Sequence, residues 1–217
     1  MTGQLTEAAV LEFGTGQLHR VLGDDYKGTV MLAGGAFKTL LHGRPPRDLD
    51  LWVPDDAERE KLIARLRGRG ARPMSASRYT EAFDVAGTLV EVPRKADRIG
   101  IQVHFQRVDI GVAAVAVLLA DGKLKAAVHP LARESERRRA ILFMKPLVNW
   151  RHCLACLARA CRYANELDWQ LPASEEEYIW ATFEAQSPEM QTGMIERGAV
   201  TAIPDTAILA EARQRNR

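Results

Sequence analysis

MLAGGAFKTLLHGRPPRDLDLWV, residues 31–53, is the stretch that decides the fold of this 217-residue chain. Its apolar start predicts a strand that ends at Gly34-Gly35, where a short helix over residues 36–41 begins. The Arg-Pro-Pro-Arg segment at residues 44–47 is predicted to be a stiff loop, because neither proline can extend a helix. Residues 48–53 then alternate acidic and apolar side chains, which is the pattern of a half-buried strand.

The last strand of this stretch carries two acids, Asp48 and Asp50. Residues two apart on a strand project to the same face, so the two carboxylates are expected side by side, with Leu49 and Leu51 facing the core. Carboxylates this close repel one another unless a cation lies between them. Mg²⁺ prefers oxygen ligands and binds one or two carboxylates together with substrate phosphates. Two such ions about 4 Å apart can activate a hydroxyl and stabilise a leaving pyrophosphate.

The glycine turn supplies the other half of the predicted site. Gly34 and Gly35 lie where a strand turns into a helix, and unpaired amide groups at such a place attract anions. Without side chains, the backbone there can approach a triphosphate closely. Lys38, about one turn into the helix, and Arg44 or Arg47 in the loop can offset the remaining phosphate charge. These five residues are the predicted nucleotide-binding groups.

The order strand, Gly-Gly, short helix, Gly-Arg-Pro-Pro and Asp-hydrophobic-Asp resembles the head domain of the polymerase-beta-like nucleotidyltransferase superfamily. Residues 31–53 are most similar to the branch that holds tRNA nucleotidyltransferases and bacterial poly(A) polymerases. The resemblance implies that Gly34 and Gly35 hold the nucleotide phosphates and that Asp48 and Asp50 bind the metals. It is strong over about 25 residues and looser from there to about residue 165.

The chain also departs from that branch. The branch often has an arginine and an aspartate where this chain has Lys38 and Thr39. The later Arg-Arg-Asp base-selecting motif of tRNA-adding enzymes and their long RNA-binding C-terminal region are not evident. CCA addition is therefore not expected of this sequence.

The resemblance implies a third catalytic carboxylate on a later strand, and two acids compete for this role. Glu91 lies in a predicted strand with apolar neighbours on both sides, and Asp109 opens a nearly all-apolar segment. An acid inside an apolar strand needs a reason to be there, which favours Glu91, while Asp109 stays the alternative. The predicted catalytic set is therefore Asp48, Asp50, Glu91 and Asp109, with Asp48, Asp50 and Glu91 as metal ligands.

The rest of the chain predicts an α/β (α+β) protein: a mixed nucleotidyltransferase-type sheet with flanking helices and a helical C-terminal third. Further strands are expected at residues 79–85, 88–92, 101–105 and 109–119, with hairpin turns at Ala86-Gly87 and Asp121-Gly122. Helices are expected at residues 57–69, 131–142, 146–167 and 174–185, with weaker helical segments near Glu189 and Ile208. These patterns divide the chain into a head domain, residues 1–130, and a helical region, residues 131–217.

The composition, 47% hydrophobic and 27% charged, is ordinary for a globular protein. A net charge of +2 does not by itself indicate a nucleic-acid partner. No apolar run approaches a membrane span and no signal pattern begins the chain, so a cytoplasmic location without a membrane partner is expected. The expected cofactor is Mg²⁺, and the expected partners are a nucleoside triphosphate and an acceptor.

The leading hypothesis is a magnesium-dependent nucleotidyltransferase that moves a nucleoside monophosphate to an acceptor hydroxyl. The acceptor stays open between RNA, a protein side chain and a small molecule. The alternative is a catalytically degenerate nucleotide-binding or protein-interaction module of the same fold. Convergence of a third carboxylate on the aspartate pair distinguishes the two hypotheses.

Overall fold

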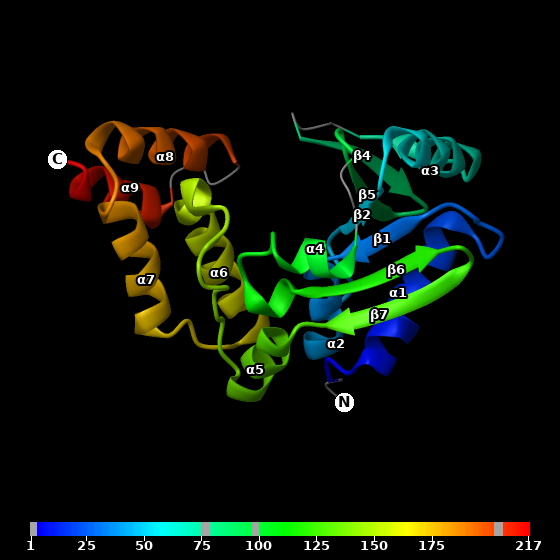
Figure 1. Cartoon of the computed structure of the whole chain (residues 1–217), viewed down its shortest axis with the longest axis horizontal. Coiled ribbons are helices and arrows are strands. Elements are labelled where there is room, and N and C mark those ends of the chain that lie inside the picture. The colour runs from blue at the N-terminus through cyan, green and yellow to red at the C-terminus, as the bar shows by residue number, and fades with distance from the viewer. Residues whose placement is uncertain (1–3, 75–78, 97–99, 202–205) are drawn as a thin grey trace. The chain divides into compact units, whose positions relative to one another are not determined.

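The computed structural model describes residues 4–74, 79–96, 100–201 and 206–217. The chain divides into two compact units (Figure 1). Unit 1 comprises Met1–Gln106 and Val112–Arg133, and unit 2 comprises Arg107–Gly111 and Glu134–Arg217. The expected division into domains at residue 130 stays a prediction.

Unit 1 is built on a mixed sheet, and over the described residues its seven strands have the order β3-β4-β5-β2-β1-β6-β7. Neighbouring strands run antiparallel except β2 and β5, which run parallel. The predicted mixed sheet with flanking helices is confirmed. The strand bounds are β1 Val30–Ala33, β2 Leu49–Trp52, β3 Arg72–Pro73, β4 Thr80–Val85, β5 Thr88–Pro93, β6 Val115–Ala120 and β7 Lys123–Val128.

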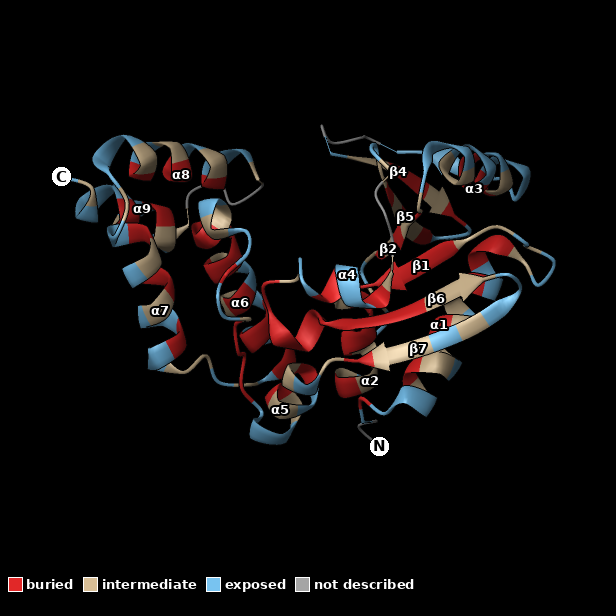
Figure 2. Cartoon of the chain, viewed as in Figure 1, coloured by how far each residue is buried: buried red, intermediate tan, exposed pale blue. Residues whose placement is uncertain are grey.

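The stretch that decides the fold forms the centre of this sheet. All four residues of β1 are buried, and Figure 2 shows this strand in the colour of buried residues. After Gly34 a 3-10 helix, η1 (Gly35–Lys38), continues into a single α-helical turn, α2 (Thr39–His42). Gly43 ends this turn with φ 71°, a left-handed conformation that glycine adopts without strain. β2 then alternates buried and half-buried residues, as its sequence pattern predicts.

Both predicted hairpin turns are confirmed. Ala86 and Gly87, between β4 and β5, have φ 49° and 82°, and Asp121 and Gly122, between β6 and β7, have φ 51° and 69°. Two consecutive positive φ values define the type I′ turn, whose twist matches that of the flanking strands. The hairpins therefore follow from local turn chemistry.

Two longer helices pack on the sheet of unit 1. The first, α1 (Glu7–Leu22), lies against β6 and β7 (Figure 1). The second, α3 (Asp56–Gly68), begins at Asp55, whose carboxylate accepts a hydrogen bond of 2.8 Å from the Glu58 amide. Its buried residues are Leu62, Ile63 and Leu66.

The prediction of a strand over residues 101–105 is wrong, because these residues form a helix, α4 (Ile101–Phe105). Its buried residues are Ile101, His104 and Phe105, which is the i, i+3, i+4 spacing of one helix face. The predicted strand over residues 109–119 is also too long. A 3-10 turn, η2 (Gly111–Ala113), precedes β6, which begins only at Val115.

Unit 2 is helical, as predicted for the C-terminal third. Its core is α6 packed against α7, α8 and α9. The N-cap residue of α7 is Pro172, which has no side-chain capping bond. The remaining elements are α5 Pro130–Arg138, η3 Trp150–His152, α6 Cys153–Leu167, α7 Ala173–Glu184, α8 Pro188–Val200 and α9 Ala207–Arg215. Over the described residues, no helix is long and apolar enough to span a membrane.

The contact between α1 and the sheet makes a first prediction. A Cβ atom added at Gly14 would lie 2.5 Å from Cγ2 of Val117, whereas one added at Gly16 of the same helix meets nothing within 4 Å. Gly14→Ala should therefore lower the free energy of unfolding by about 1–3 kcal/mol through overpacking. Gly16→Ala should raise it by up to about 1 kcal/mol through helix propensity. Urea unfolding of both variants measures the difference, and equal effects would contradict this packing.

Candidate active site

Strand pairing brings two of the predicted carboxylates to one face of the sheet in unit 1. Asp50 on β2 is in register with Ala33 on β1 and with Glu91 on β5. Side chains in register on neighbouring strands project to the same face. Asp50 and Glu91 are both half-buried, so neighbouring acids of adjacent strands share a partly enclosed surface.

Asp48 lies one residue before β2 and close to this pair. Its side chain is 18% exposed, and its Oδ2 accepts hydrogen bonds from Nε and Nη2 of Arg47 at 2.9 and 2.7 Å. The negative charge of Asp48 also acts on Glu91, whose pKa it raises. The structure therefore brings together Asp48, Asp50, Glu91 and Arg47.

The electrostatics of Glu91 show an excess of negative charge at this place. Burial raises the pKa of Glu91 above its ordinary value of 4.5, and the neighbouring Asp48 carboxylate raises it further. The Arg47 guanidinium and a hydrogen bond with Thr80 act in the opposite direction and lower this pKa. Because the raising effects dominate, the ionised form of Glu91 needs more positive charge than Arg47 supplies.

The donor set fits the predicted Mg²⁺. Carboxylate oxygens are the ligands that this ion prefers, and the raised pKa of Glu91 marks a place where a cation is favourable. In the present conformation, the described residues contain no group of three or more His, Cys, Asp or Glu side chains that could hold a metal ion. The nearby cation is instead Arg47, bound to Asp48.

Gly34 connects the carboxylates to the glycine turn. Its φ of 90° and ψ of −143° belong to a region that favours glycine. A Cβ atom there would lie 3.5 Å from Oδ2 of Asp50, so the turn borders this carboxylate directly. The Gly34 amide donates a hydrogen bond of 3.1 Å to the carbonyl of Val115. An anion at this turn would therefore use the amides that follow Gly34, beginning with Gly35.

The predicted cationic groups have different surroundings. Lys38, in η1, is only 8% exposed, so most of its side chain lies against protein. Arg44 and Arg47 are exposed residues of the proline loop. The Arg44 amide donates a hydrogen bond of 3.0 Å to Nδ1 of His42, which fixes the start of this loop.

Asp109 belongs to unit 2, whereas Asp48, Asp50 and Glu91 belong to unit 1. Asp109 is buried, and its carboxylate accepts hydrogen bonds from the amide and Nδ2 of Asn149 at 3.1 and 2.8 Å and from Sγ of Cys156 at 3.3 Å. Asp109 does not open a strand as predicted, because residues 111–113 form a 3-10 turn and β6 begins only at Val115. These contacts join residues 107–111 to Asn149 and α6 of unit 2 and are typical of a structural role, while the catalytic role of Asp109 stays a prediction.

Two further residues, Trp52 and Thr80, adjoin the acids but were not predicted from the sequence: Trp52 lies on the same strand as Asp50, and Thr80 hydrogen-bonds Glu91. Trp52 follows Asp50 by two residues on β2 and therefore lies on the same face of the sheet. Its ring packs edge-on against the ring of His104 in α4, with the ring centroids 5.4 Å apart. Its indole Nε1 is buried without a hydrogen-bond partner in the described part of the chain. The alternation of β2 alone predicts that Trp52 shares the face of Asp50. The position of Thr80 near Glu91 depends on the pairing of β4 with β5, which the sequence does not show.

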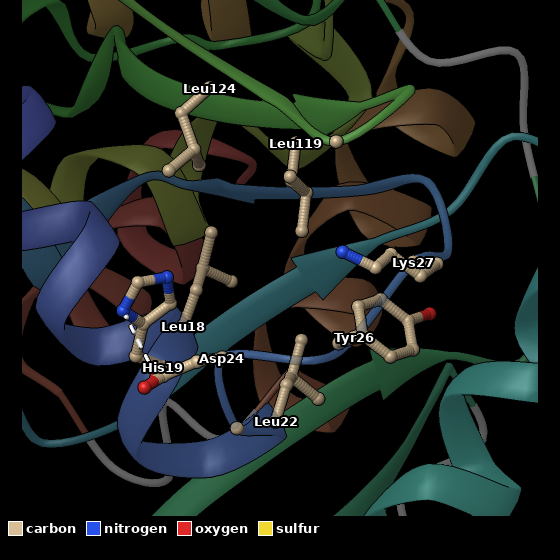
Figure 3. Close-up of a pocket in the computed structure, with 10 residues that line it drawn as sticks. Leu18, His19, Leu22, Asp24, Tyr26, Lys27, Leu119 and Leu124 are labelled. Atoms are coloured by element: carbon tan, nitrogen blue, oxygen red, sulfur yellow. Dashed lines mark ion pairs between the residues drawn. The ribbon is translucent and has the colours of Figure 1, made fainter.

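A small pocket in unit 1 lies elsewhere. Figure 3 shows it between the end of α1, the loop after it and the β6–β7 hairpin. Leu18 and Leu119 contribute apolar walls, and an ion pair of 3.2 Å between His19 and Asp24 lies at its edge. None of the predicted site residues lines it.

Comparison with solved structures shows that the chain has the fold of tRNA nucleotidyltransferases, which confirms the resemblance found in residues 31–53. It is similar to a tRNA-processing enzyme (TM-score 0.55, 18% identity, covering 96% of this chain and 56% of that chain). It is also similar to the Thermotoga maritima CCA-adding enzyme complexed with tRNA (0.56, 16%, 97% and 54%). A third similar structure is a CCA-adding enzyme complexed with ATP (0.58, 16%, 96% and 52%).

The chain spans about half the length of these enzymes. No protein-family model and no curated protein matches its sequence. At 16–18% identity the similarity establishes the fold. The chemistry of this chain must therefore be argued from its own residues.

The raised pKa of Glu91 predicts how stability depends on pH in metal-free buffer. When the pH is above 4.5, the ordinary pKa of a glutamate, the unfolded chain releases the proton of Glu91 more readily than the folded chain does. Glu91 therefore destabilises the fold increasingly as the pH rises. The effect levels off above the folded-state pKa and disappears below 4.5. Glu91→Gln should therefore be more stable than the wild type at pH 7 and equally stable at pH 4. Thermal unfolding in EDTA at both pH values checks this, and a Glu91→Gln variant that is less stable at pH 7 would contradict it.

The contacts of Asp109 make a separate prediction about stability. In Asp109→Asn, an NH₂ group replaces a carboxylate oxygen that accepts hydrogen bonds. The free energy of unfolding in urea should therefore fall by about 1.5–3 kcal/mol. Asp168→Asn is the matched control in unit 2. Asp168 ends α6 with φ 54°, a conformation that asparagine tolerates, so this change should be near neutral. Equal stability of the two variants would remove the structural role of Asp109.

Proposed function

We propose that this protein is a magnesium-dependent nucleotidyltransferase, which transfers a nucleoside monophosphate from a nucleoside triphosphate to an acceptor hydroxyl. The observation that carries the proposal is the register of β2. It puts Asp50 beside Glu91 and next to the Gly34 turn, with Asp48 close by. The fold of tRNA nucleotidyltransferases supports this activity in general.

In this reaction the acceptor oxygen attacks the α-phosphorus and forms a new P–O bond. The bond from that phosphorus to the bridging oxygen breaks, and pyrophosphate leaves with its electron pair. The proton of the hydroxyl passes to a carboxylate of the site, which acts as the general base. Magnesium held by Asp48, Asp50 and Glu91 would neutralise charge that develops on the phosphates.

The triphosphate would lie along the glycine turn. Gly34 borders the Asp50 carboxylate, and the backbone amides that follow it, together with the exposed Arg44 and Arg47 of the loop, can pair with phosphate oxygens. This arrangement would direct the α-phosphorus toward the carboxylates.

The acceptor is a hydroxyl of RNA, protein or a small molecule. Similar structures include a CCA-adding enzyme complexed with tRNA and a tRNA-processing enzyme with CTP. Those complexes make an RNA 3′ hydroxyl the first acceptor to test. Protein and aminoglycoside hydroxyls are the next two.

One observation favours a second candidate, a nucleotide-binding or interaction module without catalysis. The described residues hold no assembled metal-binding group, and Arg47 is bound to Asp48. Such a module would bind nucleotide without turning it over. Transfer assays distinguish it from the enzyme.

The test is to incubate the protein with Mg²⁺, each α-labelled nucleoside triphosphate and RNA, protein or aminoglycoside acceptors. Asp48→Asn, Asp50→Asn and Glu91→Gln should each lower transfer by at least about 100-fold, because each removes charge that the transition state requires. Asp121→Asn, in the β6–β7 turn, is the control and should keep full activity. Thermal unfolding verifies that each variant is folded.

Transfer that survives in the Asp48 and Asp50 variants would remove both residues from the mechanism. Nucleotide binding without transfer to any acceptor class would establish the second candidate.

A further inference from the structure

We propose that Arg47 competes with the divalent metal for Oδ2 of Asp48, so that a metal ion can bind this oxygen only when Arg47 has been displaced. The inference rests on the proposed function and adds a step to it: the site exchanges one cation for another. This exchange couples metal binding to nucleotide binding.

The first support is the geometry of the ion pair. Two nitrogens of Arg47, Nε and Nη2, donate to the same oxygen, Oδ2 of Asp48, at 2.9 and 2.7 Å. Charge-assisted bonds of this length are the strong class of protein hydrogen bonds. A metal ion bound to that oxygen would need the space and the lone pairs that the guanidinium uses.

The second support is the distribution of charge. Asp48 and Glu91 are close enough for one carboxylate to affect the other, and Arg47 acts on both. A divalent ion bound beside these acids would repel the Arg47 guanidinium, because both the ion and the guanidinium are positively charged. The two cations therefore compete for Oδ2 of Asp48.

The third support is that Arg47 can leave without disturbing the core. Its side chain is 66% exposed, whereas that of Asp48 is 18% exposed. Arginine also pairs readily with phosphate oxygens. A triphosphate at the neighbouring glycine turn would give Arg47 a new partner, so nucleotide binding should favour metal binding, and the reverse.

The experiment is calorimetric titration of the metal-free protein with Mn²⁺ in the absence of nucleotide. Arg47→Gln should bind Mn²⁺ about two- to fivefold more tightly than the wild type, the range expected for loss of a partly exposed ion pair. Arg47→Lys, which keeps the charge but not the two-nitrogen contact, should fall between them. A nonhydrolysable ATP analogue should tighten Mn²⁺ binding more in the wild type than in Arg47→Gln.

Arg72→Gln is the matched control, because it removes the same charge from another Arg–Asp pair on the same sheet, that of Arg72 with Asp84. Its Mn²⁺ affinity should match that of the wild type. If Arg47→Gln binds Mn²⁺ no more tightly than Arg72→Gln, Arg47 does not compete with the metal. Should Asp48→Asn still abolish Mn²⁺ binding in that case, the proposed function stands while this inference fails. Absence of Mn²⁺ binding in every variant, with or without nucleotide, would overturn both.

Discussion

The register of β2 between β1 and β5 is the constraint on which the candidate site depends. Leu49 and Leu51 are fully buried, and burial of each such side chain contributes about 1.5–3 kcal/mol. A slip of one residue would expose both leucines and turn Asp50 into the core. The apolar half of the strand therefore fixes where its acidic half points. Through the parallel pairing with β5, it also determines that Asp50 meets Glu91.

Local patterns in the sequence were sufficient for much of this arrangement. The alternation of β2, the Gly34 turn and both hairpins depend on neighbouring residues alone, and all are present. Nonlocal pairing was not predictable in the same way. Glu91 was favoured as an acid in an apolar strand, but only the sheet shows that it pairs with Asp50. The five residues of α4 alternate well enough to resemble a strand, and tertiary packing decides that they form a helix.

Two buried or half-buried acids show how context separates function from structure. Asp109 has hydrogen-bond donors from Asn149 and Cys156 around it, so its charge is satisfied within unit 2. Glu91 lies among carboxylates, and its pKa is raised by burial and by Asp48. A satisfied buried acid is typical of a structural role, whereas clustered acids that lack positive charge are typical of a site that binds cations. The sequence alone could not rank these two residues firmly, because both occur beside apolar runs.

We expect a nucleotide and a divalent ion to bind together between the glycine turn and the acids Asp48, Asp50 and Glu91. The most direct test is a crystal structure of the protein with Mn²⁺ and a nonhydrolysable nucleoside triphosphate, with the ion located by its anomalous scattering. The account predicts Mn²⁺ bound to Asp48 and Asp50, phosphates along the backbone after Gly34, and Arg47 turned from Asp48 toward the phosphates. A nucleotide bound elsewhere, such as in the pocket beside His19, with no ion at the acids, would contradict it.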